Sequence, residues 1–103
     1  MTLEQEKTIA RAYEALETIT AVGAEKGLKI ICNISAENGL WASIEKPSWR
    51  MFKEPFLRDL RIKSIAEVEQ WEQAIIAEIN SCAAELVEDR VQALKAELAR
   101  LTQ

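Results

Sequence analysis

The chain has 103 residues, of which 49% are hydrophobic and 29% charged, a balance typical of one folded domain and not of a disordered chain. Lys and Arg number 13 against 17 Asp and Glu, and the net charge of -4 argues against a uniformly basic nucleic-acid binder. The complete absence of histidine excludes Ser-His-Asp and Cys-His catalysis as well as histidine metal sites.

The first predicted element is a helix over residues 3–22. Thr2 followed by Gln5 is a capping-box pattern that marks its start. Apolar residues then recur at helical spacing, at Ile9, Ala12, Tyr13, Leu16 and Ile19. Because Gly23 and Gly27 follow directly, we expect the helix to end at residue 22.

The next segment predicts a β-hairpin over residues 28–46. Apolar and polar residues alternate over 28–34 and again over 40–46, which is the period of half-buried strands. Asn38-Gly39 lies between them and suits a turn with positive φ. Residues 57–63 alternate in the same way, so we expect a third short strand, which would support a hairpin that is marginal alone.

The last predicted element is a long helix over residues 65–101. Ser64 and Glu67 form a second capping-box pattern, and no Gly or Pro follows up to residue 103. A helix of this length measures about 55 Å, whereas a compact chain of this size is roughly 35 Å across. The fold class is therefore α+β, a single small domain over residues 1–103 whose C-terminal helix overhangs it.

Two apolar sectors lie on this helix, displaced from each other by roughly a quarter turn. The first, which we expect to face the hairpin, contains Ile65, Val68, Trp71, Ile75, Ile79, Cys82 and Leu86. The second contains Ala83, Val87, Val91, Leu94, Leu98 and Leu101. From Val87 to Leu101 these residues are separated by steps of 4, 3, 4 and 3. These steps are typical of a coiled-coil seam, with Val91 and Leu98 at a positions and Leu94 and Leu101 at d positions.

Three arrangements would cover the second sector. The N-terminal helix folds back over it, a second copy of the chain packs on it, or the helix breaks near Asn80 and forms a helical hairpin. In the second case, residues 64–103 extend into a dimer interface. A parallel pairing would bring Arg90 near Lys95 of the other chain, which is repulsive, so the antiparallel direction is favoured.

The segment 46–63 differs from the rest of the chain because it is basic and aromatic. It has six basic and two acidic residues, a net charge of +4, whereas residues 1–45 and 64–103 are both acidic. Such residues suit an anionic protein surface or single-stranded nucleic acid, and they also suit packing beneath the acidic helices. The candidate partner-binding residues are Trp49, Arg50, Met51, Phe52, Lys53, Arg58 and Arg61.

No enzyme motif is present, and we expect no catalytic residues, no cofactor and no metal. Cys32 and Cys82 form no CxxC pair, so we expect buried free thiols in a reducing cytoplasm. The N-terminal residues lack the features of a signal peptide, and no apolar run approaches the roughly 20 residues that span a bilayer.

These observations favour a non-catalytic protein-binding accessory module that acts as a homodimer. An adaptor, a subunit or a small inhibitor of the kind encoded by phages and small operons fits this composition. One alternative is a nucleic-acid-binding accessory protein that uses segment 46–63. Another is an acidic inhibitor that mimics DNA through its C-terminal helix, with Glu67, Glu69, Glu72, Glu78, Glu85, Glu88, Asp89 and Glu97.

Overall fold

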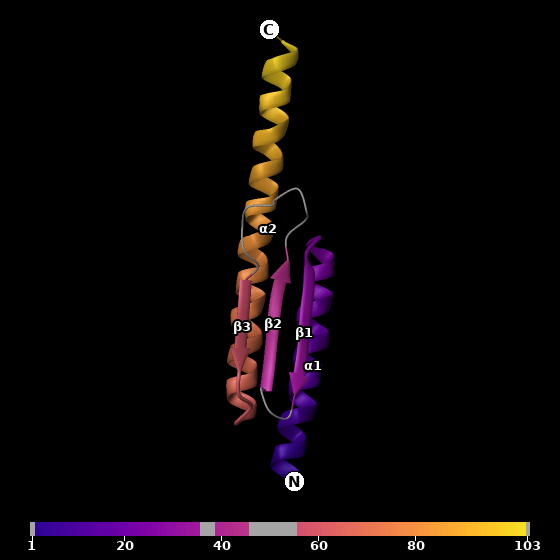
Figure 1. Cartoon of the computed structure of the whole chain (residues 1–103), viewed down its shortest axis with the longest axis vertical. Coiled ribbons are helices and arrows are strands. Elements are labelled where there is room, and N and C mark those ends of the chain that lie inside the picture. The colour runs from indigo at the N-terminus through magenta and orange to yellow at the C-terminus, as the bar shows by residue number, and fades with distance from the viewer. Residues whose placement is uncertain (1, 36–38, 46–55, 103) are drawn as a thin grey trace.

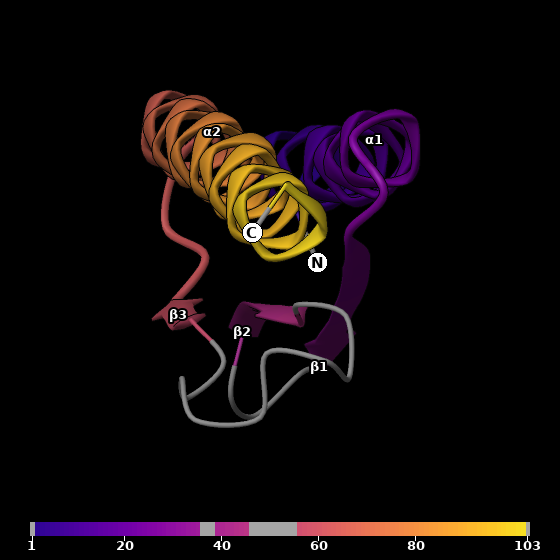
Figure 2. The same ribbon diagram turned by 90° about the horizontal axis from the view of Figure 1, so that it is seen from above.

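The structure, a computed structural model, describes residues 2–35, 39–45 and 56–102. Within these residues the elements follow in the order α1 (Leu3–Glu25), β1 (Lys29–Ser35), β2 (Gly39–Glu45), β3 (Phe56–Leu60) and α2 (Ile65–Leu101). The three strands form an antiparallel sheet in the order β1-β2-β3, and α1 and α2 lie on the same face of it (Figures 1 and 2). The predicted α+β fold is confirmed, including the presence of a third strand. This strand was predicted over residues 57–63 but ends at Leu60, which pairs with Leu40 at the start of β2.

The central strand β2 supplies the sheet's share of the core. Its residues Leu40, Ala42 and Ile44 are fully buried, and they pair in register with Ile34, Cys32 and Ile30 of β1. The predicted alternation is confirmed, since these β1 residues pack on the same core. From the helices the core takes Ala12, Ala15 and Ile19 of α1 and Val68, Trp71, Ile75, Ile79 and Cys82 of α2.

Helix α1 begins as predicted and ends later than predicted. The Gln5 backbone N–H donates to Thr2 Oγ1 at 3.2 Å and the Thr2 N–H donates to Gln5 Oε1 at 2.8 Å, which completes the capping box. The predicted end at residue 22 is wrong, because the helix continues through Gly23 to Glu25. Gly23 does not stop the helix; its missing side chain leaves the space that Ile30 of β1 fills.

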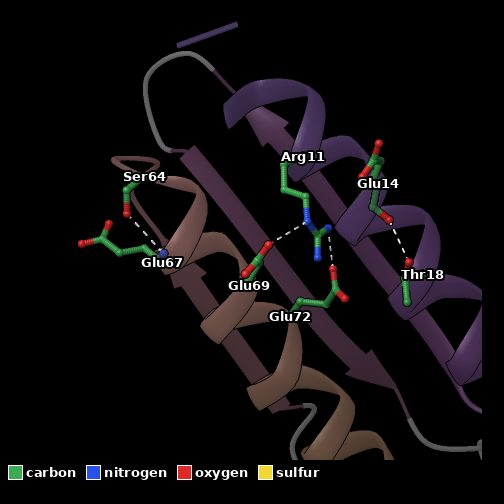
Figure 3. Close-up of polar contacts among 7 residues, drawn as sticks. All are labelled: Arg11, Glu14, Thr18, Ser64, Glu67, Glu69 and Glu72. Carbon is green, nitrogen blue, oxygen red and sulfur yellow. Dashed lines mark hydrogen bonds and ion pairs between the residues drawn. The ribbon is translucent and has the colours of Figure 1, made fainter. Parts of the chain in front are cut away.

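Helix α2 is continuous from Ile65 to Leu101, as predicted, so the alternative of a break near Asn80 is wrong. At its start the Glu67 N–H donates to Ser64 Oγ at 3.2 Å, but only this half of the capping box forms (Figure 3). The Glu67 side chain does not bond the Ser64 backbone N–H. Its Oε2 atom is buried and has no hydrogen-bond partner among the described atoms.

The protein is a rod. It measures 69 × 19 × 15 Å and has a radius of gyration of 17.5 Å, against about 13 Å for a compact chain of this length. Helices α1 and α2 start at the same end and run in the same direction, and α2 continues well beyond the sheet and α1 (Figure 1). The predicted overhang of the C-terminal helix is therefore present.

Two glycines provide a matched test of how tightly the hairpin is packed. Gly27 and Gly39 both have φ of 75°, but a Cβ on Gly27 would meet nothing within 4 Å, whereas one on Gly39 would meet the Leu60 carbonyl and the Arg61 backbone. We expect Gly27→Ala to lower the free energy of unfolding by about 1 kcal/mol through its backbone conformation alone. Gly39→Ala should lower it by clearly more, as measured by chemical denaturation. Equal losses would contradict the crowding at Gly39.

Candidate protein-docking surface

The second half of α2 presents an apolar surface to solvent. We call residues 87–101 the overhang and its five Val and Leu residues the stripe. Their exposed fractions are 65% for Val87, 42% for Val91, 55% for Leu94, 63% for Leu98 and 71% for Leu101. The alternative in which α1 covers the stripe is therefore wrong for the described protomer. Contiguous exposed apolar side chains of this kind mark sites of protein interaction.

Helix α1 leaves the stripe bare because it is too short. The helices start together, and α1 has 23 residues where α2 has 37. The C-terminal end of α1 lies beside the middle of α2, where a notch of about 690 Å³ forms. The notch is lined by Glu25, Lys26, Asn80, Ala83, Ala84, Leu86, Val87 and Arg90. Val87, the first residue of the stripe, therefore lies where α1 stops.

The stripe lies on the side of α2 that faces α1. Arg11 of α1 contacts Glu69 and Glu72, which marks that side in the first half of α2. At about 100° per residue, Val87 has the same angular position as Glu69, and Leu94 lies about 40° from Glu72. One continuous face of α2 therefore packs against α1 in its first half and is uncovered in its second half.

An ion cluster holds the first halves of the two helices together. Arg11 Nη1 donates to Glu72 Oε2 at 2.8 Å, and Arg11 Nε lies 3.5 Å from Glu69 Oε1 (Figure 3). The Glu72 side chain is only 8% exposed. The hydrogen bond that Arg11 donates to Glu72 raises the pKa of Arg11 above its ordinary value, and the charges of Glu72 and then Glu69 raise it further, against a smaller opposing effect of burial. The sequence analysis missed this cluster because its members are about 60 residues apart and share no motif.

The predicted basic and aromatic surface is only partly described. Trp49, Arg50, Met51, Phe52 and Lys53 lie outside the described residues. Arg58 and Arg61 are both exposed. Arg58 stands opposite Ala42 in the sheet register, whereas Arg61 follows β3 and lines a separate groove.

This groove lies at the end of the molecule where both helices begin. It has a volume of about 1080 Å³ and is lined by apolar residues, among them Ile9, Ile34 and Ile62, and by the basic residues Lys7, Arg61 and Lys63. Among the described residues, none that lines it has a buried side-chain polar atom without a partner. We assign it no ligand.

Other kinds of site are not found in the described part of the chain. No group of three or more Cys, Asp and Glu side chains there could hold a metal ion, and no helix there has both the length and the apolarity to cross a membrane. Cys32 and Cys82 are free thiols, as predicted, although Cys32 is only half-buried and lies 3.4 Å from Thr20 Oγ1.

Comparison with protein-family models, with curated proteins and with solved structures finds no match. The surface of the molecule itself is therefore the guide to its function. The exposed stripe on α2 is its most distinctive feature.

The ion cluster can be tested by removing one partner and then both. Arg11→Leu leaves the Glu72 carboxylate buried beside an apolar side chain, so we expect a loss of about 2–3 kcal/mol in the free energy of unfolding. The double variant Arg11→Leu with Glu72→Leu should regain most of that loss, since no buried charge remains. Urea denaturation measures both. A single variant as stable as the wild type would show that the cluster does not hold the helices together.

Proposed function

We propose that the chain is a non-catalytic protein-binding accessory module that assembles as a homodimer through the stripe. The observation that carries the proposal is the exposure of all five stripe residues on a helix that extends beyond its own domain. The absence of histidine and of nucleotide- and metal-binding motifs supports a binding role over a catalytic one.

A second copy is the partner that suits this surface best. The steps of 4, 3, 4 and 3 are the spacing of a seam in a two-stranded coiled coil, which supports self-association through the stripe. In a dimer with a two-fold axis the same patch of both copies forms the interface, so the stripe needs no second kind of surface as its partner. Complete burial of a Val or Leu side chain contributes roughly 1.5–3 kcal/mol, and the half-exposed stripe residues would gain a part of this.

In this function the described end of segment 46–63, which carries Arg58 and Arg61, stays available for a second protein. Its Arg58 and Arg61 are exposed, and the segment carries a net charge of +4. An adaptor or subunit with an anionic partner suits such a surface, because charged patches steer association and aromatic residues anchor it. We propose this segment as the contact for that partner.

The dimer is tested by placing charge in the stripe. Leu94→Glu with Leu98→Glu should convert a dimer into a folded monomer, because each substitution removes a buried side chain and adds a carboxylate to the seam. Analytical ultracentrifugation at micromolar concentration measures the mass, and circular dichroism checks the fold.

The matched control adds the same charges to the opposite side of the same helix turn. Gln92→Glu with Ala96→Glu lies away from the stripe, so this variant should remain a dimer. A wild-type protein that sediments as a monomer at micromolar concentration would refute self-association.

A further inference from the structure

We propose that the two copies pair antiparallel, with Leu101 of each chain seated in the notch where α1 of the other ends. This inference rests on the proposed homodimer and specifies its direction and register. The starting observation is that the stripe and α1 share one face of α2, with α1 ending beside Ala84 and Val87.

The position of α1 opposes a parallel pairing along this face. In a parallel pair, the first half of the second α2 would run beside the first half of this one, in the space that α1 fills. In an antiparallel pair, the second α2 approaches from the opposite direction and reaches its C-terminus at the notch. The C-terminal end of the second α2 then lies next to the C-terminal end of α1, and the two helices follow one line along this face.

The heptad positions define the register of this pairing. In antiparallel coiled coils an a residue of one helix packs against a d residue of the other. Extending the seam back by one step adds Ala84 as an a position at the edge of the notch. The register that matches all positions has three kinds of layer, which pair Leu101 with Ala84, Leu98 with Val87, and Leu94 with Val91. At each end a leucine therefore meets Ala84, the smallest side chain of the seam, at the edge of the notch.

The flanking charges agree with this register. In an antiparallel pair the g positions of the two helices face each other, and so do the e positions. Arg90 at g then faces Glu97 of the second copy, and Glu88 at e faces Lys95 of the second copy, and the two-fold axis repeats both attractive pairs. Within one chain Glu97 lies 3.9 Å from Arg100, and both side chains are more than half exposed. Such a surface pair is weak enough to exchange for the new one.

The parallel arrangement has the opposite electrostatics. There a g position faces the following e position of the other chain, so Arg90 meets Lys95 twice and both contacts repel. The two directions therefore predict opposite changes in the dimer dissociation constant for Arg90→Glu, which weakens an antiparallel pair and strengthens a parallel one. They also predict different lengths. An overlap over residues 84–101 makes a rod of about 110 Å from two molecules of 69 Å each, whereas parallel copies stay near 69 Å.

Charge reversal on the exposed flanks tests the direction without disturbing the core. At low ionic strength, where surface pairs are least screened, Arg90→Glu should raise the dimer dissociation constant about tenfold, because it turns two attractions into repulsions. Glu97→Arg should do the same. The double variant Arg90→Glu with Glu97→Arg restores opposite charges and should bind about as tightly as the wild type. Sedimentation equilibrium measures the constants, and small-angle X-ray scattering measures the length.

Each result decides the matter. Weakening by both single variants, rescue by the double variant and a length near 110 Å establish the antiparallel register. Tighter binding by Arg90→Glu and a length near 70 Å would overturn it and leave a parallel homodimer. Single variants without effect on a dimer would overturn the register as well. A wild type that is monomeric in sedimentation would overturn the proposed homodimer itself.

Discussion

The structure depends on one constraint, which is that a single face of a small sheet is covered by two helices of unequal length that start together. The sheet needs both helices, because Leu40, Ala42 and Ile44 of β2 bury their side chains against them. Since α1 must turn back into β1 after 23 residues, it cannot follow α2 to its end. The overhang and its bare stripe follow from this mismatch.

The same constraint explains why a charged cluster is buried between the helices. Arg11 bridges to Glu69 and Glu72 near the shared start of α1 and α2. Packed apolar side chains already limit how far two helices can slide, and a hydrogen-bonded ion pair adds a contact with a definite position along both axes. We interpret the cluster as the contact that sets where α1 ends relative to α2, and therefore where the notch opens.

Elements with a strong local pattern could be predicted from the sequence. The limits of α2 were predicted to the residue, because its cap and its uninterrupted helix-forming composition are local properties. The end of α1 was predicted wrongly, because a glycine at this place is typical of a helix end. In the structure Gly23 lies inside the helix and makes room for the Ile30 side chain. Local rules could not anticipate a contact made by a later strand.

For the candidate surface, too, local patterns could be predicted from the sequence and tertiary contacts could not. The stripe was predicted from its spacing and the overhang from the length of the helix, but whether α1 covers the stripe was left open. That question needed the position of the end of α1, which depends on tertiary contacts and on the Arg11 cluster. The notch at Ala84 had no sequence signal at all, because an alanine on a helix has no distinguishing pattern.

The continuity of α2 also couples the folding of the overhang to that of the domain. A helix of about 15 residues is marginal in water when isolated, because its first turn must be nucleated at an entropic cost. In this chain the core half of α2, with Trp71, Ile75 and Ile79 buried, supplies the nucleus, and the overhang only has to propagate from it. Because the free end of a helix frays, we expect helical order to decrease from Val87 to Leu101. The folded domain therefore stabilises the helical form of the overhang.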